Sequence, residues 1–327
     1  MSEKSTGVYV VRIESKEKHP NADALELIKI GGWTVVSKLG QYNVGDFAVY
    51  VPPESIVNTE RPEFSFLNRG RKEELIKVKK IRGIYSQGLL IDKPAIECNE
   101  ETNLSDYFGI RHYQPTDEDL ITDVHEVKQP VSVSKYDIDS IRKYRFVFKD
   151  GEPVICTEKI HGFSLRFIYK DGTLYGGSRN RWIAYNDVSD VWRCFKSQGT
   201  AIEDFCKAFP NHILYGEGYG NNPGFSYGLN KGERGFMAFD IMKPDGTFIN
   251  IETARSILAG YNIQQVPSWG VEPFDFEKFA ERIEKPSPFF PSNICMEGMV
   301  IKPVQERYEH NGRACFKLVS NIYLEKT

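Results

Sequence analysis

The stretch V-I-C-T-E-K-I-H-G-F-S-L-R-F-I-Y, residues 154–169, places a charged segment between two strand-like flanks. Both flanks are rich in β-branched and aromatic residues, and the second alternates large apolar side chains with others, which predicts two β-strands. Lys159 stands between the flanks, next to Glu158 and two residues before His161. Such a lysine is either a surface residue of a hairpin or a nucleophile held on a rigid edge, and the stretch alone favours the surface residue.

Further strand-like runs downstream carry isolated charges. A charge inside a strand is costly unless it faces a charged ligand, so several such intrusions in one region favour a common ligand. The runs are G-G-S-R-N-R-W with Arg179, I-L-Y-G-E-G-Y-G with Glu217, G-F-M-A-F-D-I with Asp240, C-M-E-G-M-V-I-K-P with Glu297 and Lys302, and A-C-F-K-L-V-S with Lys317.

Taken in order, these runs resemble the motif set of the covalent nucleotidyltransferases, which are the ATP-dependent DNA and RNA ligases and the messenger-RNA capping enzymes. The series K-I-H-G, S-R, Y-G-E-G, F-D, E-G-M-V-I-K and F-K covers about residues 157–319. Most of that superfamily has an aspartate at the position of His161. A histidine at this position is more similar to the motif of RNA ligases. An OB-type domain before the catalytic domain resembles one RNA-ligase clade in particular.

The resemblance implies that the Lys159 amine attacks the α-phosphorus of ATP, expels pyrophosphate and holds AMP as a phosphoramidate. AMP then passes to an RNA 5′-phosphate, and a 3′-hydroxyl displaces it to seal the strand. A free lysine has a pKa of about 10.4, and lowering it by about three units corresponds to roughly 4 kcal/mol. Lys302 and Lys317, beside Mg²⁺ or Mn²⁺, are expected to supply the positive charge that does so.

The resemblance also implies a set of ATP-binding side chains. Glu217 and Glu297 would hold the ribose hydroxyls or the metal, Phe239 would stack on adenine, and Arg179 would grip ribose or phosphate. Glu158 is assigned to the same nucleotide site. The alternatives are structural salt bridges for the two glutamates, core packing for Phe239 and snorkelling strand ends for the two lysines.

Three features depart from the superfamily pattern. The imidazole of His161 cannot serve as an anionic metal ligand, so its role stays open. Cys315 and Val319 occupy the positions two residues from Lys317, where a second lysine is common. The sequence ends ten residues after Lys317, so we expect no downstream OB domain, which argues against DNA ligases and capping enzymes.

The N-terminal region, from Gly7 to about Leu104, contains short strands broken by turns, which predicts a small barrel. The sequence of this region resembles OB-fold tRNA-binding modules in three segments, H-P-N-A-D-A-L-E-L-I-K-I, Y-N-V-G-D-F-A-V-Y-V-P and K-I-R-G-I-Y-S-Q-G-L-L. We expect a basic strip on and around one strand pair to track RNA phosphates, and the alternative is an edge strand whose lysines block aggregation. The strip comprises Arg69, Arg71, Lys72, Lys77, Lys79, Lys80 and Arg82.

Composition limits the remaining possibilities. The net charge is −3, so a polyanion must be bound by local basic patches. The six cysteines form no C-x-x-C pair, which argues against a zinc ribbon and a disulfide scaffold. No apolar run is long enough to span a bilayer and no secretory signal opens the chain, so we expect a cytoplasmic protein without membrane contact, and a monomer.

The sequence therefore predicts an α+β protein. An OB-like β-barrel over residues 1–109 is followed by a connector over 110–145. A nucleotidyltransferase (ATP-grasp-like ligase) domain of antiparallel sheets with flanking helices occupies residues 146–327. Helices are expected at 137–144, 188–196, 200–209 and 253–261, the last capped by Thr253. The predicted activity is ATP-dependent RNA ligation, and the alternatives are a nick-sealing DNA ligase and a non-catalytic RNA-binding protein with a decayed ligase domain.

Overall fold

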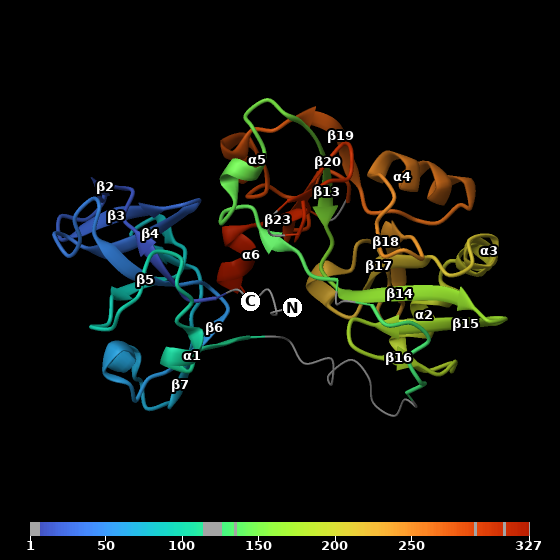
Figure 1. The fold of residues 1–327 in the computed structure, drawn as a ribbon, viewed down its shortest axis with the longest axis horizontal. Coiled ribbons are helices and arrows are strands. Elements are labelled where there is room, and N and C mark those ends of the chain that lie inside the picture. Colours follow the sequence, from blue (N-terminus) through green and yellow to red (C-terminus); the bar gives the residue numbers. More distant parts are fainter. Residues whose placement is uncertain (1–6, 114–125, 134–135, 291–292, 310–311, 327) are drawn as a thin grey trace. The chain divides into compact units, whose positions relative to one another are not determined.

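The computed structural model describes residues 7–113, 126–133, 136–290, 293–309 and 312–326, and most of the acidic connector sequence lies outside them. Within these ranges the chain folds into two compact units (Figure 1). The first contains residues up to 113, residues 139–146 and helix α6 (Asn321–Lys326), and the second contains residues 126–138 and 147–320. The domain boundaries expected at residues 109 and 145 stay a prediction.

The first unit is built from short strands, as the sequence predicts. Its three three-stranded sheets have the orders β1-β5-β10, β2-β3-β4 and β11-β6-β7, and β8 and β9 form a separate hairpin. Valine and isoleucine side chains from these strands fill its core. The elements are β1 (Tyr9–Arg12), β2 (Ser15–Lys18), β3 (Leu25–Ile30), β4 (Trp33–Lys38), β5 (Phe47–Val51), β6 (Ser55–Asn58), the 3₁₀ helix η1 (Pro62–Leu67), β7 (Glu73–Leu75), β8 (Lys79–Ile81), β9 (Ile84–Ser86), β10 (Leu89–Asp92), α1 (Ser105–Phe108), β11 (Arg111–His112) and β12 (Asp139–Ser140).

The expected basic strip is divided between two places, which corrects its predicted geometry. Strand β7 ends at Leu75 and strand β8 begins at Lys79, and β7 pairs with β6 whereas β8 pairs only with β9 among the described strands. Lys79, Lys80 and Arg82 therefore lie on the β8–β9 hairpin, and Arg69 and Arg71 lie in the exposed loop before β7.

The H-P-N sequence anchors the β8–β9 hairpin. His19 Nε2 lies 3.1 Å from the carbonyl oxygen of Ile81, and Asn21 Nδ2 donates to the carbonyl oxygen of Arg82 at 2.9 Å. His19 is buried, so the motif holds the backbone of the hairpin while the cationic side chains stay exposed.

The second unit contains two large antiparallel sheets and a separate two-stranded sheet, β21-β22. One has the strand order β16-β15-β14-β17-β18, and the other contains the neighbours β23-β20-β13-β19. Helices α2, α3 and α4 pack on the first sheet through Trp192, Phe205, Leu258 and their neighbours (Figure 1). The elements are β13 (Pro153–Lys159), β14 (Phe163–Lys170), β15 (Thr173–Ser178), β16 (Trp182–Ile183), α2 (Asp190–Lys196), α3 (Ala201–Ala208), β17 (Ile213–Tyr219), η4 (Pro223–Phe225), β18 (Gly235–Met242), α4 (Ile251–Gly260), β19 (Ser268–Pro273), α5 (Phe276–Arg282), β20 (Gly298–Pro303), β21 (Tyr308–Glu309), β22 (Gly312–Arg313) and β23 (Phe316–Val319), and the 3₁₀ helix η3 (Arg145–Val147) contains residues of both units.

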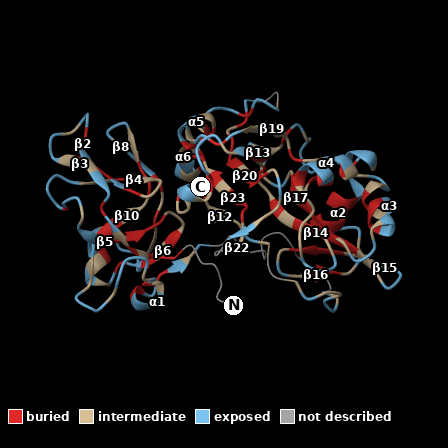
Figure 2. Cartoon of the chain, turned by 45° about the horizontal axis from the view of Figure 1, so that its top comes forward, coloured by how far each residue is buried: buried red, intermediate tan, exposed pale blue. Residues whose placement is uncertain are grey.

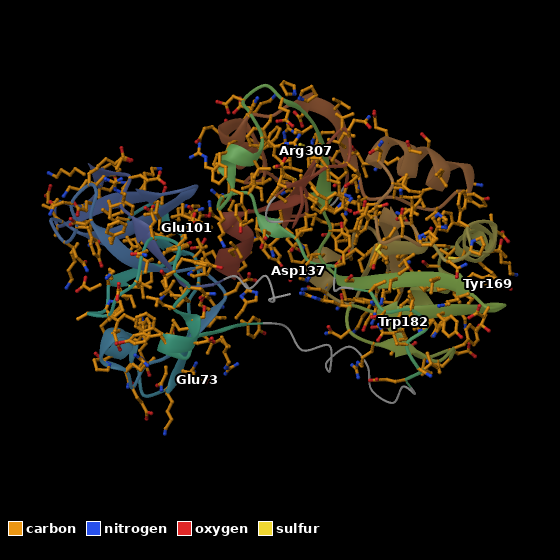
Figure 3. All side chains as sticks on the ribbon, viewed as in Figure 1. Glu73, Glu101, Asp137, Tyr169, Trp182 and Arg307 are labelled. Carbon is orange, nitrogen blue, oxygen red and sulfur yellow. The ribbon has the colours of Figure 1, made fainter. Side chains whose placement is uncertain are left out.

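Both faces of strand β14 are covered, so the neighbouring residues Phe167 and Ile168 are both buried although they face opposite sides. Phe167 faces the helices, whereas Ile168 faces a second cluster with Trp182 of β16 and Tyr136 of the connector. Figure 2 shows that buried residues are concentrated on the strands of this unit, and Figure 3 labels Trp182. The sheets are therefore rigid supports for side chains at their ends.

Two sequence predictions about helices are wrong, and further helices were not expected. Residues 137–144 form strand β12 and turns instead of a helix. Helix α4 begins after Asn250, so Thr253 lies inside it and does not cap it. Helices α5 and α6 were not expected. Within the described ranges, no helix is long and apolar enough to cross a membrane.

Candidate active site

The segment around Lys159 is not a hairpin, because its two strands belong to different sheets. Lys159, the last residue of β13, pairs with Gly298 of β20, and Phe163, the first residue of β14, pairs with Gly218 of β17. A Cβ atom at position 162 would lie 2.0 Å from the carbonyl oxygen of Gly218, so only glycine fits here. We call the segment Lys159–Phe163, where the chain passes from one sheet to the other, the crossing. The crossing brings Lys159 next to residues from both sheets.

Strand register places the three predicted catalytic lysines on one face of their sheet. Residues directly opposite each other in an antiparallel pair share a face, and the face alternates along each strand. Lys159 is opposite Gly298 and Val300 is opposite Lys317, so Lys302, two residues from Val300, shares that face. The strand register therefore brings lysines that are far apart in the sequence onto the same face of the sheet.

The Lys159 ammonium forms an ion pair with Glu297, which immediately precedes β20. The other carboxylate oxygen, Oε2, lies 3.4 Å from His161 Nδ1. Burial alone would raise the pKa of Glu297, but Lys159 and His161 lower it below its usual value. Glu297 is therefore a carboxylate whose charge favours the ammonium form of Lys159.

Glu217 lies on β17 opposite Ser164, beside the crossing. Burial, with a smaller effect of the Glu297 charge, raises the pKa of Glu217 to about 8, although Lys159 opposes the shift. Two carboxyl groups close enough to repel each other are a feature that a divalent cation would stabilise. Among the residues that the structure describes, no group of three or more His, Cys, Asp or Glu is arranged to hold a metal ion.

Lys302 is fixed by a buried ion network that joins the two sheets. Its Nζ lies 2.8 Å from Oδ2 of Asp240 on β18, and Arg313 on β22 contacts both Asp240 oxygens at 2.7 and 3.0 Å. Tyr136 donates to the same carboxylate, and Glu306 binds the other side of Arg313. Burial alone would raise the pKa of Asp240, but the charges of Arg313 and Lys302 hold it well below its usual value.

Glu158 directs its side chain away from Lys159, because successive residues of a strand face opposite sides. It is 1% exposed, and its Oε2 accepts a hydrogen bond from Ser287 at 2.7 Å. Its Oε1 has no hydrogen-bond partner among the described residues. Burial raises the pKa of Glu158 to about 7, against the effect of Ser287.

This burial predicts a pH-dependent loss of stability that Glu158→Gln should remove. Because the pKa of Glu158 is raised in the folded state, the stability that the protonated side chain contributes is fully present below about pH 4.5. This stability is lost as pH rises through about 7. Relative to Glu158→Gln, the wild type should lose on the order of 3 kcal/mol of unfolding free energy across this range. Urea unfolding at a series of pH values measures the difference, exposed Glu100→Gln is the control, and parallel curves would contradict the prediction.

The structure also locates the remaining predicted nucleotide ligands. Arg179, just after β15, donates to Asp137 at 2.9 Å, and Figure 3 labels Asp137. Phe239 is half-buried on β18 beside Tyr136, with ring centroids 5.1 Å apart. Lys317 is half-buried on β23, and no ion pair to another described residue is formed by its ammonium.

Sequence reasoning missed the residues that surround His161. Asn222, Phe225 and Tyr227 follow β17 and contact the histidine. Sequence reasoning also missed Arg313, which binds Asp240. The run N-N-P-G at 221–224 signals a turn, but a turn signal does not show which side chain the turn faces.

Two models of known protein families match the chain, one in each part of the sequence. The family model for RNA ligases matches residues 152–319, which is just over half of the chain and includes every strand from β13 to β23. The chain belongs to the RNA ligase family. An OB-fold domain model matches residues 8–93, which confirms the predicted N-terminal fold.

Solved structures similar to this RNA ligase family member share its whole fold. Naegleria gruberi RNA ligase with PPi is 23% identical, with a TM-score of 0.83 over 98% of each chain. A variant of that ligase with ATP and Mn is 21% identical, with the same TM-score over 98% of each chain. A variant with AMP and Mn is 21% identical, with a TM-score of 0.83 over 99% of each chain. No curated protein matches the chain.

Proposed function

We propose that this RNA ligase family member is ATP-dependent and works through a covalent lysyl-AMP at Lys159. The observation that carries the proposal is the crossing between the two sheets, where Lys159 meets Glu297 and lies close to Glu217. A lysine held at the end of a buried strand, next to two carboxyl groups that could bind a metal ion, has a fixed position from which it could attack a bound nucleotide.

In the proposed first step, Lys159 Nζ attacks the α-phosphorus of ATP. A phosphorus–nitrogen bond forms, the bond to pyrophosphate breaks, and the amine loses its proton. Lys302 and Lys317 lie on the same sheet face as Lys159 and would stabilise negative charge on phosphate oxygens. AMP then passes to an RNA 5′-phosphate, and the 3′-hydroxyl of the other strand displaces AMP to form the phosphodiester.

The residues present fit an adenine nucleotide. The buried Oε1 of Glu158 needs a hydrogen-bond donor, which the adenine amino group is, and the half-buried ring of Phe239 could stack on a base. Arg179 offers a guanidinium fork to ribose or phosphate. The similar Naegleria ligase is itself described with ATP and with AMP, in each case with Mn.

Glu217 and Glu297 fit a Mg²⁺ or Mn²⁺ ion. Both are oxygen donors, and Mg²⁺ usually binds one or two carboxylates together with substrate phosphates and water. The raised pKa of Glu217 reports mainly its burial, with a contribution from Glu297, and a divalent cation would relieve both effects. The bound ion would neutralise charge on the triphosphate.

RNA as the substrate is tested against DNA with nicked duplexes that differ only in the strand carrying the 3′-hydroxyl. We expect sealing with an RNA 3′-hydroxyl strand and a 5′-phosphate on the other end, at a rate at least about tenfold above the all-DNA duplex. Faster sealing of the DNA duplex would support the DNA-ligase alternative. A cytoplasmic location and a monomeric state stay predictions.

The β8–β9 hairpin is proposed to contact RNA phosphates. Lys79→Ala with Lys80→Ala should weaken RNA binding while AMP attachment is unchanged. The slope of log affinity against log salt should fall by roughly 0.7 for each phosphate that the variant leaves without a lysine partner. Filter binding at several salt concentrations measures the slope.

Two exposed lysines of the second unit, changed in Lys278→Ala with Lys285→Ala, provide a charge-matched control. A loss of affinity that does not depend on salt in the hairpin variant would refute the role of the hairpin. An equal loss in both variants would show a general effect of net charge.

A further inference from the structure

His161 lies between Asn222 and Glu297, and each contact uses a different ring nitrogen. His161 Nε2 is 3.2 Å from Asn222 Nδ2, and His161 Nδ1 is 3.4 Å from Glu297 Oε2. A neutral imidazole has one N–H donor and one acceptor nitrogen, and the group facing each nitrogen decides which is which.

The orientation of the Asn222 amide is fixed by the turn that it caps. Asn222 Oδ1 accepts a hydrogen bond from the backbone N–H of Gly224 at 2.9 Å, at the start of η4. The amino group Nδ2 therefore faces the ring of His161. Because an amide nitrogen only donates, Nε2 must accept, and the proton lies on Nδ1, which faces Glu297.

Two further contacts hold the imidazole in this position. The ring of Phe225 lies against that of His161, with centroids 4.3 Å apart and an interplanar angle of 35°. The backbone N–H of His161 donates to the Tyr227 hydroxyl at 2.7 Å, and Tyr227 is itself buried. The ring is therefore constrained from its face and from its backbone.

We propose that Asn222 is a positioning residue that keeps His161 in its Nδ1-protonated tautomer, so that His161 donates to Glu297 and fixes the orientation of this carboxylate in the proposed ATP site. An aspartate at position 161 would face Glu297 with a like charge, whereas the imidazole offers it an N–H donor. The tautomer assignment is independent of the reaction, and the effect on rate rests on the proposed lysyl-AMP function.

Asn222→Asp is the decisive variant, because its carboxylate can still accept from Gly224 N–H but cannot donate to His161. The tautomer is read from the ¹⁵N resonances of labelled histidine, with His161 assigned from the spectrum of His161→Gln. We expect an unprotonated Nε2 in the wild type and a protonated Nε2 in Asn222→Asp. The rate of AMP attachment should fall about 10- to 100-fold in Asn222→Asp, as for other partners that orient a functional histidine.

Asn221→Ala, at the exposed neighbouring asparagine, is the matched control and should change neither measurement. A wild-type His161 protonated on Nε2, or no change in Asn222→Asp, would overturn the tautomer assignment. A changed tautomer with an unchanged rate would overturn the positioning role. If the wild-type protein itself attaches no AMP, the proposed function fails, while the ¹⁵N spectra still decide the tautomer.

Discussion

Lys159→Ala should reduce covalent AMP attachment to less than about one thousandth of the wild-type rate, because the proposed nucleophile is removed while the proposed binding residues remain. The measurement incubates the purified protein with Mg²⁺ and ATP labelled at the α-phosphate, and follows label that stays on the denatured chain. A parallel reaction with labelled GTP tests the choice of nucleotide, and we expect label from ATP only.

Lys159→Arg separates the loss of a nucleophile from the loss of a charge. A guanidinium can keep the ion pair with Glu297 but is not deprotonated in proteins, so it cannot attack phosphorus. Lys159→Arg should therefore be as inactive as Lys159→Ala, and Lys278→Ala should retain full activity. Substantial labelling of either Lys159 variant, in folded protein, would show that another residue carries AMP.

Asp240→Ala should destabilise the second unit by about 3–5 kcal/mol, which is the usual effect of removing one partner of a buried ion pair. Asp240 is 0% exposed, and the substitution leaves the nearby cations of Lys302 and Arg313 without their shared carboxylate. Lys302 lies on β20 and Asp240 on β18, so the variant also removes an ion pair between the two large sheets. The free energy of unfolding in urea measures the loss.

Asp245→Ala provides the control for Asp240→Ala. Asp245 is exposed and lies 3.6 Å from Lys243, so its loss should change the free energy of unfolding by less than about 1 kcal/mol. A similar small change in Asp240→Ala would mean that Lys302 and Arg313 find other partners. Glu306 contacts Arg313 but not Lys302 in this structure, so we expect no such compensation.

The strands, the order of the charged residues along them and the nucleophile candidate follow from the sequence alone. Alternation over two residues identifies a strand such as β14, and charges in apolar strands mark Glu217, Lys302 and Lys317 as residues with a special role. These features are local, since each depends on a few consecutive side chains. The family resemblance added the role expected of each residue.

How these residues meet depends on the tertiary structure. Alternation does not specify which strand is a partner, so the sequence could not show that β13 and β14 belong to different sheets or that the basic residues are divided between a loop and a hairpin. Nor could it pair Lys302 with Asp240, or His161 with Asn222, because these contacts join residues 61 or more positions apart. Such contacts depend on strand register and on close backbone approaches, such as that of Gly162 to Gly218, which exist only once the sheets have formed.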